Sequence, residues 1–125
     1  MNVSIAKVKS SDLPECLEII HQSFKTVAEV FGLTKENCPR HTSFIPLSFL
    51  EAQRDRGWHM YALCVGEKIV GYMSLSQEGD DVFELHNLAV LPEYRYNGFG
   101  KMLLDYAKKF DDLPFTSGYL EWKGE

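Results

Sequence analysis

The sequence predicts an α+β fold in which a central, mostly antiparallel sheet is flanked by helices. Three apolar, strand-like segments, MYALCV, IVGYMSLS and VFELHNLAV, follow one another with only a few turn residues between them. Turns this short join antiparallel neighbours, because a parallel connection needs a crossover of about a dozen residues or more. Amphipathic helical patterns stand before and after the three segments, so we predict helices that pack on the sheet.

The bulk composition narrows the class of protein. The 125 residues suggest one domain, residues 1–125, and no apolar run approaches the roughly 20 residues of a membrane span. The formal net charge of -5 argues against a nucleic-acid partner. The first residues carry no apolar core of a secretory signal, so we predict a cytoplasmic protein without a membrane partner.

The N-terminal part predicts one strand followed by a helix. The segment NVSIAKVK has strand spacing, and Asp12 with Glu15 three residues later has the spacing of a capping box that starts a helix. Apolar residues then recur at helical intervals: Leu13, Cys16, Leu17, Ile20 and Phe24. This face is expected to pack on the sheet.

The next segments are a predicted lid and a second helix. Residues 26–43 give a mixed signal with Gly32 and Pro39, in the manner of a lid, and SFIPLSFLEAQRDRG predicts a helix that ends near Gly57. After Val90 a third helical pattern places one apolar face of a helix at Phe99, Met102, Leu103, Tyr106 and Phe110. GYLEW alternates well enough to predict one last short strand.

The three cysteines do not form a recognisable metal or redox motif. Cys16, Cys38 and Cys64 are an odd number without CxxC spacing, so we predict buried thiols. Cys38 and His41 have the spacing of half a metal site, but the sequence shows no second pair. We therefore predict no metal.

The segment LAVLPEYRYNGFGKMLLDYAKKF, residues 88–110, predicts an anion site. A strand end, two glycines set two apart and a helix start leave backbone N–H groups unpaired, and the helix dipole favours negative charge there. Gly98 and Gly100 lack a Cβ, so phosphate oxygens can reach the amides of residues 96–101. Arg95 and Lys101 are expected to add charge-assisted hydrogen bonds.

Two other phosphate motifs do not fit this segment, although a plain tight turn remains an alternative. A Walker A loop needs Ser or Thr after its lysine, whereas Met102 follows Lys101. A dinucleotide fingerprint needs a third glycine where Leu103 stands, and it belongs after the first strand of a parallel unit.

The same residues resemble the acetyl-CoA motif of the GNAT superfamily of acyl-CoA-dependent N-acyltransferases. That pattern is an apolar strand end, Pro, Tyr-Arg, two further residues, Gly-x-Gly and a Leu-rich helix, and it is matched throughout. The order of the preceding elements from Met1 is similar as well. The resemblance implies acetyl-CoA as acetyl donor, its pyrophosphate on the amides of the loop, and its pantetheine arm along a strand end that carries a β-bulge. The implied binding residues are Leu88, Ala89, Val90, Arg95, Tyr96, Asn97, Gly98, Phe99, Gly100 and Lys101.

The resemblance also implies attack by an amine on the thioester, which needs a base and a group that stabilises the oxyanion. Glu84 and His86 precede the motif and share one face of the strand if alternation holds. We favour Glu84 as the base; an exposed strand residue is the alternative. Asn87 either orients substrate or fixes the bulge.

The predicted function is an acetyl-CoA-dependent N-acetyltransferase acting on a primary amine of a small molecule or peptide. Family members normally continue through a further helix and closing strands, which this sequence lacks after GYLEW. The alternative is therefore a catalytically impaired CoA-binding or interaction module of the same fold. The shortened sheet would expose an edge, and we predict a homodimer in which a second copy covers it.

Overall fold

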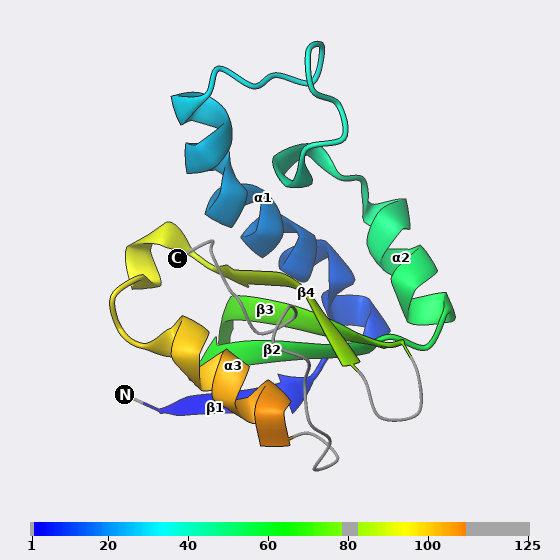
Figure 1. Cartoon of the computed structure of the whole chain (residues 1–125). Helices are drawn as coiled ribbons and strands as arrows, with labels where there is room; N and C mark the ends of the chain where they lie inside the picture. The colour runs from blue at the N-terminus through cyan, green and yellow to red at the C-terminus, as the bar shows by residue number, and fades with distance from the viewer. Residues whose placement is uncertain (1, 79–82, 110–125) are drawn as a thin grey trace.

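The computed structural model describes residues 2–78 and 83–109, and within them one four-stranded sheet has helices on both faces (Figure 1). The strands lie in the order β1-β2-β3-β4, and every neighbouring pair is antiparallel. The predicted α+β fold and its meander are thereby confirmed. The elements in chain order are β1 (Val3–Lys7), α1 (Leu13–Val30), α2 (Leu47–Asp55), β2 (His59–Val65), β3 (Lys68–Gln77), β4 (Phe83–Val90) and α3 (Phe99–Lys109), with 3-10 turns at Ser10–Asp12, Thr42–Phe44 and Pro92–Tyr94.

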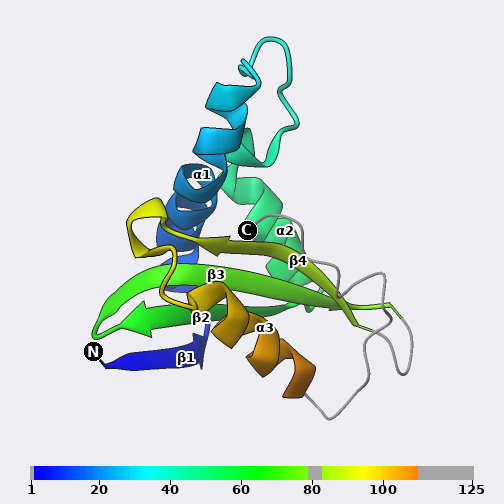
Figure 2. The same ribbon diagram turned by 60° about the vertical axis from the view of Figure 1, so that its left-hand side comes forward.

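The sheet separates two helical layers. Helices α1 and α2 cover one face and α3 covers the other, as the two views in Figures 1 and 2 show. Both α1 and α3 contact β3 and β4, the two strands at one side of the sheet. On the α3 face, the rings of Tyr61 and Tyr106 meet edge to face with centroids 5.1 Å apart. Phe99 and Leu103 of the predicted apolar side of α3 are buried, whereas Met102 of the same predicted face is exposed.

Helix α1 begins where the sequence predicts, but its cap differs. Leu13, Cys16 and Ile20 of the predicted apolar face are buried. The predicted capping box is wrong, because the Asp12 side chain does not cap α1. Its carboxylate instead accepts the backbone N–H of Lys9 at 3.1 Å, one 3-10 turn earlier. Because the Asp12 carboxylate accepts this hydrogen bond, it does not accept one from the first backbone N–H groups of α1.

Helix α2 is shorter than predicted. The sequence pattern suggested a helix from residue 43, whereas the structure has a separate 3-10 turn and starts α2 at Leu47. Pro46 explains the break, because a residue before proline is pushed out of the helical region, and Ile45 is extended with φ -63° and ψ 144°. Gly57, with φ +82°, ends the segment as expected.

The cysteines are free thiols, and one of the three is fully buried. Cys16 lies inside α1 against the sheet, and burial raises the pKa of its thiol to about 12, with Asp12 and Glu15 adding to the effect. Cys38 and Cys64 are half-buried. Predicted buried thiols are thus found in full only at Cys16. The predicted last strand, GYLEW, lies outside the described residues.

Gly71 of β3 lies close to three neighbouring elements. A Cβ at this position would lie 3.3 Å from Ala89 O, Leu103 Cδ1 and Leu63 Cβ, so β4, α3 and β2 all close on it. We expect Gly71→Val to lower the free energy of unfolding by about 1–3 kcal/mol, because the added methyl groups must displace the backbone of β4 or the Leu103 side chain of α3. Urea unfolding followed by circular dichroism measures this loss.

Gln77→Val is the matched control, since Gln77 is exposed at the end of the same strand. Its free energy of unfolding should stay within about 0.5 kcal/mol of the parent. Equal stability of Gly71→Val and the parent protein would contradict the close packing around Gly71.

Candidate functional site

Strand β4 contains a bulge immediately before its apolar end. Ser74 pairs with His86 and Tyr72 pairs with Ala89, so two steps along β3 are matched by three along β4. The extra residue falls at Asn87, whose φ is +51°, a left-handed conformation that asparagine tolerates better than most residues. The bulge that the resemblance implied is present. Because it adds one residue to β4, the alternation of side chains between the two faces of the sheet shifts by one residue across the bulge.

The turn between β4 and α3 presents a row of backbone amides. Tyr96 and Gly98 both have positive φ, +65° and +76°, and they turn the chain into the first residue of α3. Within the described part of the chain, none of the backbone N–H groups of residues 96–101 donates a hydrogen bond. A Cβ at Gly98 would meet nothing within 4 Å. The start of α3 therefore has both the free donors and the open approach that an anion needs.

The two side chains predicted to add charge at this turn, Arg95 and Lys101, already make hydrogen bonds to other groups of the chain. The guanidinium of Arg95 donates to the carbonyl oxygen of Ser23 in α1, and the Arg95 backbone N–H donates to Pro92 O at 3.3 Å. Lys101 Nζ lies 2.9 Å from Asp105 Oδ2 one turn further along α3. Arg95 thus fastens the turn to α1, and the amides carry the positive character of the turn.

One further cation lies beside the turn. Lys68 Nζ sits 5.4 Å from the ring centre of Tyr94. The two meet because the backbone N–H of Leu91 donates to Val70 O at 2.9 Å and so carries the turn alongside the start of β3. Sequence reasoning missed Lys68, since its only signal is the pairing of β3 with the segment after β4.

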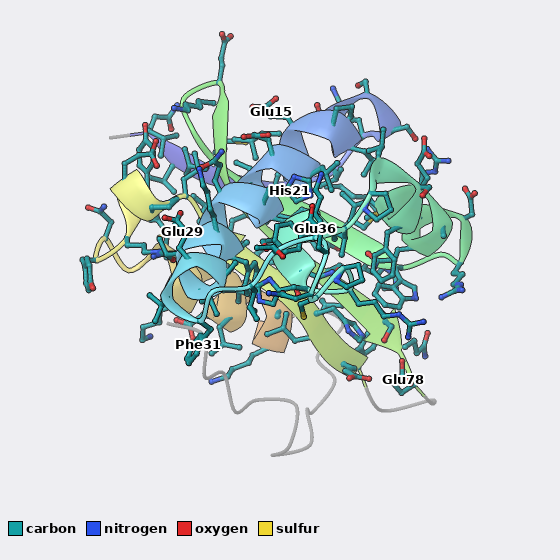
Figure 3. All side chains as sticks on the ribbon, turned by 90° about the horizontal axis from the view of Figure 1, so that it is seen from above. Glu15, His21, Glu29, Phe31, Glu36 and Glu78 are labelled. Atoms are coloured by element: carbon teal, nitrogen blue, oxygen red, sulfur yellow. The ribbon has the colours of Figure 1, made fainter. Side chains whose placement is uncertain are left out.

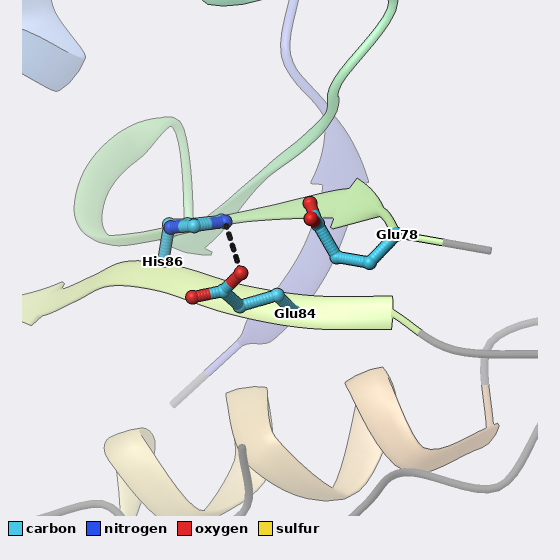
Figure 4. Close-up of side chains that lie close together, drawn as sticks. All are labelled: Glu78, Glu84 and His86. Atoms are coloured by element: carbon cyan, nitrogen blue, oxygen red, sulfur yellow. Dashed lines mark ion pairs between the residues drawn. The ribbon is translucent and has the colours of Figure 1, made fainter. Parts of the chain in front are cut away.

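A polar cluster occupies the α1/α2 side of the sheet where β3 and β4 pair. His86 Nε2 lies 2.8 Å from Ser76 Oγ and 3.8 Å from Glu84 Oε2, and Ser76 Oγ also donates to Glu78 Oε2. Figure 4 shows the side chains of Glu84 and His86 on β4 and of Glu78 just after β3 lying close together. We call Ser76, Glu78, Glu84 and His86 the His86 cluster. The predicted shared face of Glu84 and His86 is therefore observed, and it is joined by Ser76 of β3 and by Glu78, which directly follows β3.

Trp58 covers the His86 cluster. Its indole ring stacks on the imidazole of His86 with centroids 4.3 Å apart and 24° between the planes. The backbone N–H of Trp58 donates to Gln53 O at 3.1 Å, which fixes the tryptophan at the end of α2. No local pattern in the sequence predicts this contact, because it joins the loop after α2 to a strand nearly 30 residues away.

Three side chains of the His86 cluster are of types that can bind a metal ion, and they form the one such grouping among the described residues. One ligand atom each from Glu78, Glu84 and His86 lie within 4.8 Å of one another. Cys38 and His41 are not part of such a grouping in the described chain, and His41 Nδ1 lies 2.7 Å from Ser43 Oγ.

Tyr72 is a buried phenol next to the bulge. It is fully buried, and burial raises the pKa of its hydroxyl, an effect that the neighbouring Ser74 side chain partly offsets. Within the described residues the hydroxyl makes no hydrogen bond of good geometry.

A hollow of about 230 Å³ lies between α1 and the segment that leads to α2. Figure 3 looks onto this side of the molecule, with His21 and Glu29 along α1. His21 Nε2 lies 2.7 Å from Ile45 O, which ties the segment to the helix. The residues that line the hollow are His21, Gln22, Lys25, Ala28, Glu29, Leu33, Ser43 and Phe44. It lies on the same side of the sheet as the His86 cluster.

No helix in the described ranges is long and apolar enough to span a bilayer.

Relatives identify the family of this arrangement. A family model described as the acetyltransferase (GNAT) family matches residues 18–112. An uncharacterized N-acetyltransferase of Bacillus velezensis is 42% identical over 99 residues, covering 70% of this chain and 61% of that protein. Another, from Bacillus licheniformis, is 37% identical over 75 residues, covering 52% of this chain and 46% of that protein. The chain thus spans about half to three fifths of the length of these relatives.

Solved structures share the fold. The PaiA N-acetyltransferase of Thermoplasma acidophilum in complex with coenzyme A superimposes with a TM-score of 0.73 at 20% identity, covering 90% of this chain and 73% of that one. A GNAT family acetyltransferase of Brucella melitensis in complex with acetyl-CoA gives 0.67 at 15% identity, covering 89% and 70%. At these identities the likeness shows the fold alone.

Proposed function

We propose, since the chain belongs to the GNAT family of acetyltransferases, that it transfers an acetyl group from acetyl-CoA to a primary amine of a small molecule or peptide. We also propose that residues 1–125 belong to one acetyltransferase domain. The proposal depends on one observation: the backbone N–H groups of residues 96–101, which follow a bulged strand, donate no hydrogen bond within the described residues. Acetyl-CoA supplies the acetyl group as an activated thioester.

The proposed cofactor site follows β4 into the turn. The diphosphate would lie on the amides of residues 96–101, where the dipole of α3 favours negative charge. Leu88, Ala89 and Val90 are buried, with at most 7% of each residue exposed, and β4 is an edge strand of the sheet in the described residues. A pantetheine arm can therefore pair along β4 as an additional strand would. Arg95 acts in this proposal by holding the turn against α1, because its guanidinium is already bonded there.

The proposed acid–base pair is Glu84 and His86. An amine is protonated near neutral pH and must lose a proton before its nitrogen attacks a carbonyl carbon. Glu84 and His86 lie on β4 just before the bulge, are partly exposed and face the same side. In the net reaction the nitrogen loses two protons. One goes to the base, and the other accounts for the thiol that leaves when the C–S bond breaks.

The hollow beside α1 is the proposed acceptor site. Its volume, about 230 Å³, suits a small molecule or the end of a peptide. Glu29 is among its lining residues and offers a carboxylate to an ammonium group. The predicted cytoplasmic location and the predicted homodimer stay predictions; sedimentation at micromolar concentration tests the dimer.

Thiol release separates an enzyme from a module that only binds CoA. The protein is incubated with acetyl-CoA and a panel of polyamines, amino acids and peptides, and free thiol is followed. Release above the rate with water alone supports the transferase. Calorimetric binding of desulfo-CoA without amine-dependent thiol release would instead support the catalytically impaired module.

We expect Gly98→Asp to weaken binding of desulfo-CoA about tenfold more than Gly98→Asn, a difference of about 1.4 kcal/mol. The two side chains have the same shape and both tolerate a positive φ, so they share any backbone cost. Only Asp places a negative charge beside the proposed diphosphate. Isothermal titration calorimetry gives both affinities.

Thermal unfolding of the same two variants is the control. Asp at the start of a helix is favourable, so Gly98→Asp should unfold at a temperature no lower than Gly98→Asn. Equal affinity of the two variants for desulfo-CoA would rule out an anion on these amides.

We expect Glu84→Gln to lower kcat by about 10²–10⁴-fold, the usual contribution of acid–base catalysis. The amide cannot take a proton or stabilise a positive charge on His86, 3.8 Å away. Affinity for desulfo-CoA should stay near that of the parent, because Glu84 lies before the bulge and outside the proposed cofactor site. A matching fall in affinity would show that Glu84 serves binding and not proton transfer.

A further inference from the structure

A single hydroxyl joins His86 to a carboxylate. Ser76 is almost fully buried, with 3% of the residue exposed, and its Oγ lies 2.8 Å from His86 Nε2. The same oxygen donates its hydrogen to Glu78 Oε2. Ser76 lies near the end of β3 and Glu78 directly follows the strand, and neither belongs to the sequence motif that identifies the family.

The hydrogen count of this chain of groups determines the form of His86. A hydroxyl has one hydrogen, and an ionised carboxylate can only accept, so the hydrogen of Ser76 is committed to Glu78. The bond between Ser76 Oγ and His86 Nε2 then needs its hydrogen from the imidazole. In the neutral ring, a hydrogen on Nε2 leaves Nδ1 with the lone pair.

The surroundings of the ring leave Nδ1 as its accessible basic atom. Figure 4 shows Nε2 turned toward the carboxylates and the other ring nitrogen on the far side of the ring. Among the described residues Nδ1 has no hydrogen-bond partner. Trp58 stacks on the ring plane at 4.3 Å and restricts its rotation. Glu84 Oε2, 3.8 Å from Nε2, is too distant for a hydrogen bond and close enough to stabilise a positive ring.

We propose that Ser76 and Glu78 are positioning residues that hold His86 as the Nε2–H tautomer and so make Nδ1 the atom that accepts the proton of the acceptor amine. The assignment rests on the proposed acetyltransferase function and specifies its base. In the step, an N–H bond of the ammonium breaks and an Nδ1–H bond forms. The resulting imidazolium keeps its Nε2–H bond to Ser76 and faces the carboxylate of Glu84.

Nuclear magnetic resonance reads the tautomer without any substrate. Long-range ¹H–¹⁵N correlation spectra of the ¹⁵N-labelled protein distinguish the two neutral tautomers of each histidine, at about pH 9, well above the ordinary histidine pKa of about 6.5. The chain has four histidines, and the signals lost in His86→Gln identify His86. The expected result is a hydrogen on Nε2 and none on Nδ1.

Charge reversal at Glu78 should reverse the tautomer. In Glu78→Lys the hydroxyl of Ser76 no longer has a carboxylate to bond, and it can donate to Nε2, which moves the imidazole hydrogen to Nδ1. We expect the Nδ1–H form to predominate and kcat to fall at least about tenfold, since a protonated Nδ1 cannot act as base. The double variant Ser76→Ala with Glu78→Lys lacks the hydroxyl and should return to Nε2–H.

Glu67→Lys is the matched control. It makes the same charge change at an exposed position in the turn between β2 and β3 and should leave the His86 tautomer unchanged. An Nδ1–H tautomer in the parent protein, or no change of tautomer in Glu78→Lys, would overturn the proposal. A change of the His86 signals on adding EDTA would also overturn it, because a bound cation would then hold the ring. If the tautomers behave as expected and no amine releases thiol, the failure lies in the proposed function and not in the geometry of His86.

Discussion

The extra residue in β4 is the constraint from which the rest of the site follows. Between the pairs Ser74–His86 and Tyr72–Ala89, β4 uses one residue more than β3, and Asn87 takes the left-handed conformation that this requires. Before the bulge, polar side chains of β4 face α1 and α2. After it, the strand continues as a buried apolar end and runs into the turn. Without the added residue, β4 would alternate without interruption. The side chains on one side of the bulge would then point to the opposite face of the sheet.

Backbone, more than side chains, supplies the positive character at the end of β4. Arg95 and Lys101 are bonded to Ser23 O and Asp105, so their charges hold the turn and the helix in place. Among the described residues, the backbone N–H groups of residues 96–101 have no hydrogen-bond acceptor. The proposed anion site of this protein, whose net charge is -5, therefore does not depend on a surface rich in cations.

The sequence predicted elements whose signals are local. The strand meander and the start of α3 at Phe99 follow from short turns, glycines and apolar periodicity, and they are present. The capping box of Asp12 failed because a 3-10 turn competes for the same carboxylate. The partners of His86 could not be predicted, since Ser76, Glu78 and Trp58 reach it through strand register and a tertiary contact. The alternating serines of β3, Ser74 and Ser76, can be related to His86 and Glu84 only when the register of β3 and β4 is known.

The two ends of β4 carry opposite electrostatic character, and their separation lets one strand serve both. From Glu84 to Val90 there are six residue steps of about 3.3 Å, which amounts to about 20 Å before the bulge shortens it. The Debye length at physiological ionic strength is about 8 Å, so carboxylates at one end repel a diphosphate beyond the other end only weakly. The proposed base, which is flanked by two glutamates, is therefore compatible with the proposed diphosphate site at the other end of the same strand. The strand is also stiff, because β3 and the core behind Gly71 close on it, so the distance between the two sites is set by the fold.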